Sequence, residues 1–523
     1  MFAPPLYKVK KFPLSLLIEN NYHLSSKDDL DRFLINQQDN MLFRQIRLIT
    51  GDSGKRNDYI IFVNCKGGKS HQEAMENIIQ HGFWVDYRHY VICERSASMA
   101  RTSILSFVDE SIDGELTLRV TMGLKMENTV LSKWYAYRGL MLSSCHCLEG
   151  WKPRIIIVPD LYRTIPNQTI RYVYDKEVTY EKDGKVLPWI QKEIATGTRD
   201  IEICVSDGCG FHDPDITDIV RGMLDSNTTP TSILLRLPFI KGVSHELDYK
   251  SFYQERGVTE IVDVWGVHHD VSPASEPAMI LPVSMYKGYK YFNNTGTYED
   301  WQHYWDMFDK FNHCVGVTKW NFSIDEEPVM TRANYQILQD LDLSFEDFEY
   351  LAKPSIDWIT QILEGDPVAL YVFLGLFADS HSGLNVYAEA LMKNHEMIHE
   401  DGVRKYISSL VNKTIDDMKC GKIYLRACFK FLAPDLIMLM EHAGGLPPVG
   451  CLASDEFFSF NKFGVLNGEY VIERNPHISK SEHVVLNAVD NKFTQKYLSH
   501  LENVCVINSY SITPQRLNGA DFD

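Results

Sequence analysis

Hydrophobic and polar positions change their period along the chain, and each change marks an expected boundary. Up to residue 125, short strand-like runs such as residues 59–63 and 116–120 alternate with polar turns that contain glycine. No recognisable chemical motif stands out in this part of the sequence. We therefore expect an α+β accessory domain over residues 1–125.

Strand-like patterns dominate from about residue 126 to residue 325. Residues 155–158 form a run of β-branched side chains after Arg154, and residues 170–180 and 186–187 are also strand-like. Lys182-Asp183-Gly184 lies between the last two runs and predicts a hairpin turn. Several strands separated by turns are typical of a barrel, so we expect a first barrel over residues 126–325.

The apolar period becomes helical over residues 326–445, which we interpret as a connector. Ser344-Phe-Glu-Asp347 has the residue types of a helix start, and amphipathic stretches continue through residues 391–440. The Gly444-Gly445-Leu-Pro447-Pro448 segment ends this block, and residues 464–471 and 484–489 are again strand-like. A second β unit over residues 446–523 suggests a duplicated barrel.

Composition narrows the class of protein. The chain has 523 residues, of which 45% are apolar, and this is enough for several domains with their own cores. The net charge of −18 argues against a surface-wide attraction to nucleic acid. Any polyanion must therefore bind in an internal groove. An acidic protein with no nucleic-acid partner is the alternative on charge alone.

The cysteines and apolar runs indicate a cytoplasmic protein. None of the 11 cysteines forms a Cys-x-x-Cys pair, and Cys145-His146-Cys147 has no partner pair nearby, so reduced thiols and no structural zinc are expected. The N-terminus lacks a signal-type apolar run, and the longest apolar stretch, residues 368–378, is too short to span a bilayer. We expect no membrane partner.

The last residues supply candidate metal ligands. Asp521 and Asp523 stand two positions apart, and on an extended segment such side chains point to the same side. They could share Mg²⁺ or Mn²⁺, which prefer carboxylate oxygens. The alternative interpretation is a solvated acidic terminus.

Four segments together form a pattern of motifs, and the last of them includes Asp521 and Asp523. The four segments are residues 131–144 (LSKWYAYRGLMLSS), residues 206–210 (SDGCG) with 235–242 (LRLPFIKG), residues 283–287 (VSMYK), and residues 474–476 (RNP) with 518–523 (NGADFD). In order and spacing they resemble the two-barrel RNA polymerases, namely the RNA-dependent RNA polymerases of RNA silencing and their single-chain bacterial and phage relatives. The resemblance extends from about residue 130 to residue 523.

The resemblance implies a fold and a function. The fold is α+β, with two double-psi β-barrels, the second incomplete, joined by the helical connector. The function is template-directed RNA synthesis from NTPs on a single-stranded template, with RNA expected and DNA as the alternative. A non-catalytic nucleic-acid-binding barrel protein is the alternative from another class. In the family a third carboxylate follows in Asp-x-Asp-Gly-Asp, so we expect a C-terminally truncated chain that is inactive alone.

The same resemblance assigns residues to roles. Lys241 and Lys287 would face the metal loop and meet the triphosphate, with Asp521 and Asp523 as the metal ligands. Substrate-binding roles fall to four further residues, namely Arg474, Asn475, Arg236 and Lys290, of which Lys290 is the substitute for Lys287.

Two of these positions have alternatives. Arg474 could be a surface arginine before a turn, and Arg236 could pair with an acid inside the barrel. Asp207 is expected to shape a turn. After Pro476 the chain departs from the family pattern, which leaves the course of that loop open.

Overall fold

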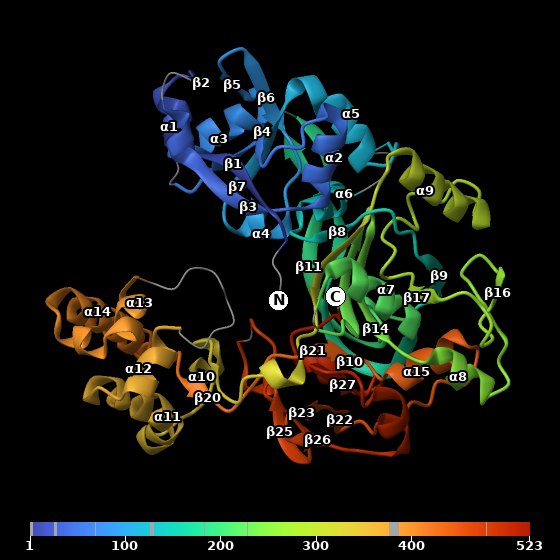
Figure 1. Cartoon of the computed structure of the whole chain (residues 1–523). Coiled ribbons are helices and arrows are strands. Elements are labelled where there is room, and N and C mark those ends of the chain that lie inside the picture. Colours follow the sequence, from blue (N-terminus) through green and yellow to red (C-terminus); the bar gives the residue numbers. More distant parts are fainter. Residues whose placement is uncertain are drawn as a thin grey trace.

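In the computed structural model (Figure 1), the described residues are 4–25, 29–67, 70–125, 130–182, 184–226, 228–375, 386–476 and 478–522. Asp183 of the expected hairpin turn and Asp523 of the expected metal pair lie outside them. Among the described residues, no helix combines the length and the apolar character that crossing a membrane requires.

The N-terminal part is a seven-stranded mixed sheet covered by helices, with strand order β2-β5-β6-β7-β4-β1-β3. Its strands are β1 (Leu6–Pro13), β2 (His23–Leu24), β3 (Leu34–Gln38), β4 (Arg56–Asn64), β5 (Phe83–Val85), β6 (Arg88–Ile92) and β7 (Ile104–Asp109). Its helices are α1 (Leu14–Glu19), α2 (Met41–Thr50), α3 (Ser70–His81), α4 (Ala97–Arg101) and α5 (Glu110–Val120). The strand prediction for residues 59–63 is confirmed by β4.

The strand prediction for residues 116–120 is wrong, because this run is the end of α5. Asp109 caps the helix by accepting a hydrogen bond from the Ser111 N–H at 3.0 Å. Ile112, Leu116 and Val120 are buried at intervals of four residues, which places them on one helical face. The cap and this longer period outweigh the local preference for a strand.

A second seven-stranded sheet follows, with order β8-β18-β13-β14-β12-β17-β9. Its strands are β8 (His146–Leu148), β9 (Arg154–Val158), β12 (Cys209–His212), β13 (Ser232–Leu237), β14 (Ile240–Glu246), β17 (Ala278–Pro282) and β18 (Val315–Trp320). The nearby helices are α6 (Leu131–Arg138), α7 (Pro214–Leu224), α8 (Tyr249–Gln254) and α9 (Tyr298–Lys310). β9 confirms the strand predicted at residues 154–158.

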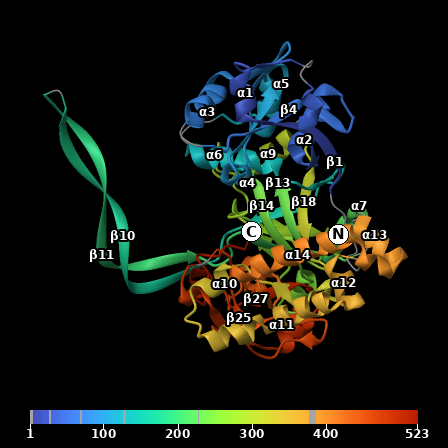
Figure 2. The ribbon, with the colours of Figure 1, turned by 90° about the vertical axis from the view of Figure 1, so that its left-hand side faces the viewer.

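Between β9 and β12 the chain forms a long hairpin, β10 (Tyr162–Lys182) and β11 (Lys185–Cys204). The strands predicted at residues 170–180 and 186–187 are confirmed. Their assignment to a barrel is wrong, because β10 and β11 pair with each other in a separate two-stranded sheet. Figure 2 shows this hairpin projecting from the body of the molecule.

The connector is helical, as expected, and consists of α10 (Gln336–Gln339), α11 (Phe345–Glu364), α12 (Pro367–Phe373), α13 (Val386–Lys393), α14 (Asp401–Lys419) and α15 (Leu436–Ala443). The predicted start at Ser344 is confirmed. Ser344 Oγ accepts from the Asp347 N–H at 3.1 Å, and the Asp347 carboxylate accepts from the Ser344 N–H at 3.0 Å. This reciprocal pair is a capping box.

The C-terminal part contains a five-stranded sheet with order β21-β27-β22-β26-β25. Its strands are β21 (Phe431–Ala433), β22 (Glu456–Phe458), β25 (Gly468–Ile472), β26 (Val484–Ala488) and β27 (Val504–Ile507). The strands predicted within residues 464–471 and 484–489 are confirmed. β21 comes from the range expected to be connector and pairs in parallel with β27.

The remaining elements are short. The two-stranded pairs are β15 (Glu260–Val262) with β16 (His268–Asp270), β19 (Thr331–Arg332) with β20 (Tyr424–Leu425), and β23 (Phe460–Asn461) with β24 (Gly464–Val465). The short helices are α16 (Thr513–Arg516), η2 (Leu30–Phe33), η3 (Gly139–Leu142), η4 (Ile324–Glu326), η5 (His395–His399), η6 (Lys480–Glu482) and the π-helical η7 (Thr494–Leu498).

The two later sheets share one strand plan. In β9-β17-β12-β14-β13 the successive pairs are parallel, antiparallel, parallel and antiparallel. In β21-β27-β22-β26-β25 the successive pairs follow the same alternation. When these five strands are numbered along the chain, their order in both sheets is first, fifth, second, fourth, third. The duplication suggested by the sequence therefore has a counterpart in the strand topology.

A shared core joins these two sheets. One cluster of buried side chains includes Ile156 and Phe211 from the first sheet together with Phe457 and Val506 from the second. Phe522, with 4% of its surface exposed, belongs to the same cluster. Burial of this apolar surface holds the end of the described chain against the first sheet.

Candidate functional site

The segments singled out in the first sheet meet through backbone hydrogen bonds. The Lys241 N–H donates to the Met285 carbonyl at 3.1 Å, and the Val243 N–H donates to the Gly208 carbonyl at 2.9 Å. The Gly208 N–H donates to Ser284 Oγ at 3.2 Å. Residues 206–210, 241–243 and 283–287 therefore form one compact group of strand and loop segments, called here the lysine loops.

Gly242 explains why a glycine follows Lys241. Its φ of +152° is unfavourable for other residues. A Cβ atom at this position would lie 2.5 Å from the Gly208 carbonyl oxygen and 2.6 Å from Met285 Cε. A side chain would therefore separate the loops that place Lys241.

The two candidate lysines of the third motif lie in different surroundings. Lys287 Nζ is 3.9 Å from Asp207 Oδ1, and 18% of the Lys287 side chain is exposed. Lys290 is exposed and lies over the Tyr291 ring, with Nζ 5.0 Å from the ring centroid. Asp207 precedes Gly208, whose φ is +82°, as expected for a turn. Its carboxylate contacts Lys287 as well.

The first motif packs against these segments. Residues 131–144 form α6 and η3, and Trp134 in α6 is almost completely buried. Its ring lies 5.9 Å from that of Phe239, in the turn between β13 and β14, and 5.5 Å from that of Tyr291. Trp134 therefore packs against the turn that precedes Lys241.

On the second sheet, the two halves of the fourth motif adjoin. Arg474 lies in the loop between β25 and β26, and its Nη2 is 3.7 Å from Asp521 Oδ1. The Asn518 side-chain amide donates to the Pro476 carbonyl at 3.2 Å. These contacts bring together residues about 45 positions apart in the sequence.

One hydrogen bond joins the loops of the two sheets. The Phe522 N–H donates to the Asp207 carbonyl at 3.0 Å. Asp521, the preceding residue, has 43% of its side chain exposed. The candidate carboxylate is thus adjacent to the loop whose Asp207 side chain contacts Lys287. Segments from residues 207 and 522 meet here, although more than three hundred residues separate them.

The donor chemistry of Asp521 fits Mg²⁺ or Mn²⁺. These ions are commonly bound by one or two carboxylates, with water and substrate phosphates completing the coordination. The described residues contain no group of three or more His, Cys, Asp or Glu arranged to hold a metal. Asp521 presents an accessible carboxylate on a fixed loop. Its expected partner Asp523 lies outside the described residues.

Asn475 contributes an unsatisfied acceptor beside Arg474. Its Oδ1 atom is buried and has no hydrogen-bond donor among the described residues. Buried polar atoms are normally hydrogen-bonded, so this oxygen is available to a donor from a ligand.

His483 ties the Arg474 loop to the connector. Its Nε2 lies 3.0 Å from Asp340 Oδ1, and its Nδ1 lies 2.5 Å from Glu473 Oε1. Burial lowers the pKa of His483, but the hydrogen bond to Asp340 and the negative charge of Glu473 outweigh it, so that the pKa is raised. Charged His483 therefore links Glu473, at the other end of the loop, to Asp340 in the connector.

The raised pKa predicts how pH affects this contact. Folding favours charged His483, so its stabilisation is fully present below the unfolded pKa of about 6.5 and is lost as pH rises through the higher folded pKa. We expect His483→Gln to lower the unfolding temperature more at pH 6 than at pH 9. Exposed His399→Gln is the control and should show no such difference. A His483→Gln effect that is equal at both pH values would contradict the assignment.

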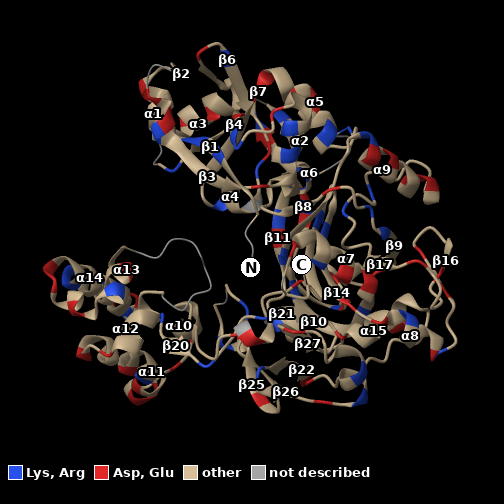
Figure 3. Ribbon diagram, viewed as in Figure 1, with Lys and Arg blue, Asp and Glu red and all other residues tan. Residues whose placement is uncertain are grey.

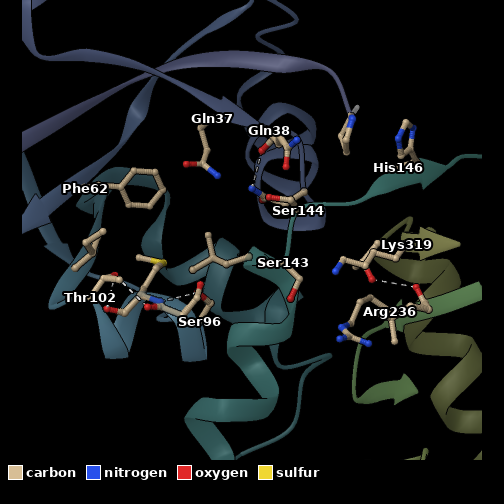
Figure 4. Close-up of a pocket in the computed structure, with 18 of the residues that line it drawn as sticks. Gln37, Gln38, Phe62, Ser96, Thr102, Ser143, Ser144, His146, Arg236 and Lys319 are labelled. Atoms are coloured by element: carbon tan, nitrogen blue, oxygen red, sulfur yellow. Dashed lines mark hydrogen bonds between the residues drawn. The ribbon is translucent and has the colours of Figure 1, made fainter. Parts of the chain in front are cut away.

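A cavity of about 880 Å³ lies between the N-terminal sheet and the β13–β18 edge (Figure 4). Its described lining includes the cations Lys11, Arg101, Arg236 and Lys319 and contains no Asp or Glu. Arg236 on β13 pairs directly across from Lys241 on β14, so the cavity adjoins the lysine loops. The substrate-binding role predicted for Arg236 stays a prediction.

The charges of this described lining are all positive, whereas positive and negative side chains are mixed elsewhere in the molecule. Figure 3 shows Lys and Arg interspersed with Asp and Glu over the elements seen in that view. Lys11, Arg101 and Lys319 were not among the sequence candidates. They come from β1, α4 and β18, and no local motif marks them. Only the folded chain brings them together.

Comparisons with known proteins confirm the resemblance to the two-barrel RNA polymerases and their phage relatives. The curated DNA-directed RNA polymerase YonO of Bacillus phage SPbeta is 26% identical over 441 residues, which cover 82% of this chain and 47% of the relative. Among solved structures, the RNA-dependent RNA polymerase QDE-1 from Thielavia terrestris matches with a TM-score of 0.57 at 13% identity.

The structural match covers 94% of this chain and 50% of the QDE-1 chain, and it shows a common overall fold. The α+β class is thereby confirmed. No family model matches the sequence. The chain spans about half the length of both polymerases that it resembles.

Proposed function

We propose that this chain forms the centre of a template-directed RNA polymerase, a nucleotidyltransferase that joins NTPs by two-metal phosphoryl transfer. The hydrogen bond from Phe522 to Asp207 carries the proposal. It places the carboxylate-bearing loop of one sheet against the lysine-bearing loops of the other. Phosphoryl transfer needs this combination, since metal ligands and cations must surround one triphosphate.

The two related sheets are proposed to be the two double-psi β-barrels. Their common strand plan supports this assignment. The domains are then residues 1–125 as an accessory domain, 126–325 as the first barrel, 326–445 as the connector and 446–523 as the beginning of the second barrel. In the second barrel, β21 is an additional strand contributed from the connector range.

Each candidate side chain has a distinct role in the proposal. Asp521 and Asp523 would hold Mg²⁺ or Mn²⁺, which when bound supplies charge neutralisation and polarises the phosphate oxygens. Lys287 and Lys241 bind the triphosphate as point charges, and a lysine ammonium can donate a proton to the departing pyrophosphate. Asp207 keeps the Lys287 ammonium near the metal loop.

Arg474 and Asn475 are proposed to bind the sugar of the incoming nucleotide. The Arg474 guanidinium can donate to ribose hydroxyls, and the unsatisfied Asn475 oxygen can accept from one. Both contacts need a hydroxyl group, so the pair would favour NTPs over dNTPs.

The cationic cavity is proposed to hold a nucleic-acid strand next to the centre. Arg236 and Lys319 lie at its sheet edge, and the absence of Asp and Glu from the described lining favours phosphate groups. The acidic net charge does not oppose this, because the described lining of the cavity carries cations and no carboxylates.

The sequence resemblance favours RNA as the template, whereas the curated relative is a DNA-directed RNA polymerase and supports the DNA alternative. Because that relative has the greater sequence identity, we expect more incorporation on DNA. The test measures Mg²⁺-dependent run-off synthesis by the complete gene product on single-stranded RNA and DNA of matched sequence. Greater incorporation on RNA would reverse the template assignment. Incorporation on neither template would leave a non-catalytic nucleic-acid-binding protein.

A further inference from the structure

The β10–β11 hairpin is far longer than its attachment requires. A strand of 21 residues extends about 65 Å at the usual rise per residue. Along most of this length both faces are exposed, and Figure 2 shows the hairpin standing apart from the other elements. An isolated two-stranded hairpin is only marginally stable in water. The exposed side chains of this hairpin therefore need a reason other than the stability of the hairpin.

The strand register assigns the side chains to two faces. Tyr172 pairs with Ala195, Tyr174 with Glu193 and Tyr180 with Leu187, so these residues share one face. The side-chain contacts agree with this assignment. The Tyr174 hydroxyl donates to Glu193 at 3.0 Å, and Lys176 Nζ donates to the same carboxylate at 2.9 Å. The pairs Asp175 with Lys192 and Glu177 with Ile190 occupy the opposite face.

The two faces differ in chemistry. The first, called here the basic aromatic face, carries Tyr172, Tyr174, Lys176, Tyr180, Lys182, Lys185, Leu187, Trp189 and Arg199, with Glu193 as its carboxylate. The opposite face carries Asp175, Glu177 and Glu181 among apolar side chains, with Arg171 and Lys192 as its cations. Basic and aromatic groups are thus concentrated on one side of the hairpin.

The aromatic rings of the basic aromatic face are accessible. Trp189 is 60% exposed and Tyr180 is 42% exposed, and the two rings contact each other edge to face at 6.2 Å. Arg199 lies 3.5 Å from the centroid of the Tyr172 ring. None of these side chains belongs to a buried core of the described residues. Folding of the body does not account for them.

We propose that the basic aromatic face binds single-stranded nucleic acid. Exposed aromatic rings can stack on unpaired bases, and adjacent lysines can contact the phosphates. This is a local reversal of charge in a chain whose net charge is −18. A protein partner fits less well, because lysine is depleted in protein interfaces. The proposal concerns binding away from the catalytic loops and does not depend on catalysis.

The test compares changes on the two faces in the complete gene product. The variant Lys182→Gln/Lys185→Gln/Trp189→Ala removes two cations and one large side chain from the basic aromatic face. The control Arg171→Gln/Lys192→Gln/Ile190→Ala removes the same net charge and one large side chain from the opposite face. Fluorescence anisotropy with a labelled 20-nucleotide oligouridine measures the affinity. Both variants should unfold at the wild-type temperature, because neither change touches a core.

We expect the first variant to bind the probe about tenfold or more weakly, because stacking and phosphate contacts are lost together. Its affinity should also depend less on salt, with the slope of log K against log salt reduced by about 1.4. The control should bind within about twofold of the wild type. Equal affinity of the first variant and the wild type, or equal losses in both variants, would overturn the proposal.

Crosslinking gives a second readout. A 4-thiouridine probe should crosslink to peptides from residues 172–189 in the wild type, and a duplex of the same sequence should compete weakly because its bases are already stacked. Crosslinks confined to the catalytic loops would overturn the proposal. Asp521→Asn should leave the hairpin crosslinks unchanged, so that loss of polymerase activity and loss of hairpin binding are distinguishable.

Discussion

Asp521→Asn is expected to reduce NTP incorporation by the complete gene product about 10³-fold or more. The substitution keeps the shape of the side chain and removes the charge that attracts a divalent ion. Loss of metal-supported charge stabilisation amounts to several kcal/mol, and each 1.36 kcal/mol is a factor of ten in rate. The measurement is single-turnover incorporation as a function of Mg²⁺ concentration, which should show a raised metal requirement.

The fold should tolerate this change. Asp521 contacts Arg474 at 3.7 Å, but both side chains are more than a third exposed, and such surface pairs contribute about 0–1 kcal/mol. The unfolding temperature should therefore remain near that of the wild type. Asp309→Asn removes an exposed carboxylate that pairs with Lys152, and it serves as the matched control. Incorporation by Asp521→Asn at the wild-type rate would exclude Asp521 as a ligand.

Lys241→Ala is expected to lower the incorporation rate by about 10²-fold or more, with template affinity changed by less than about threefold. A positioned proton donor contributes on the order of 10²–10⁴-fold in rate. The backbone hydrogen bond from Lys241 to Met285 holds Lys241 beside the segments that contain Asp207 and Lys287. Its contacts are therefore expected with the reacting triphosphate.

The rate and the affinity are measured separately, by rapid-quench incorporation and by template anisotropy. The exposed Lys152, which pairs with Asp309 on α9, supplies the control variant Lys152→Ala. This control should leave both quantities near their wild-type values. Equal losses of rate and template affinity in Lys241→Ala would make Lys241 a template contact instead.

Local patterns predicted those elements whose burial follows a simple period. The strand at residues 59–63 lies in the interior of its sheet, and the strand at residues 154–158 is buried at the edge of its sheet. The capping box at Ser344 depends only on residues within one turn. The misassigned run at residues 116–120 shows the limit of this approach. Leucine and valine suit both structures, and the cap at Asp109 lies outside the short window that suggested a strand.

The long hairpin shows a second limit. Its strands and turn were readable from the sequence, yet their pairing was not, because strand propensity does not specify a partner. The register pairs β10 with β11 along their whole length, and neither strand enters the neighbouring sheet. In the structure, the exposure of both faces distinguishes this hairpin from a pair of barrel strands.

The candidate site was predicted as a set of motifs rather than as an arrangement. Lys241, Lys287 and Asp521 could be named by resemblance, but the contact between Asp207 and Phe522 depends on two sheets packing over a common core. The cationic cavity depends on several separate parts of the chain, and of its four cations only Arg236 lies in a sequence motif. The roles of all these residues remain predictions.

The common strand plan has a consequence for assembly. Lys287 follows β17 and Asp521 follows β27, and each of these is the fifth of the five strands that share the common plan, so cation and carboxylate follow corresponding strands in the two halves. Two lysine-bearing halves would repel each other, as would two carboxylate-bearing halves. Under the proposed function, only a mixed pair would form the catalytic centre. Joining both halves in one chain fixes their stoichiometry at one to one and keeps their effective concentration high.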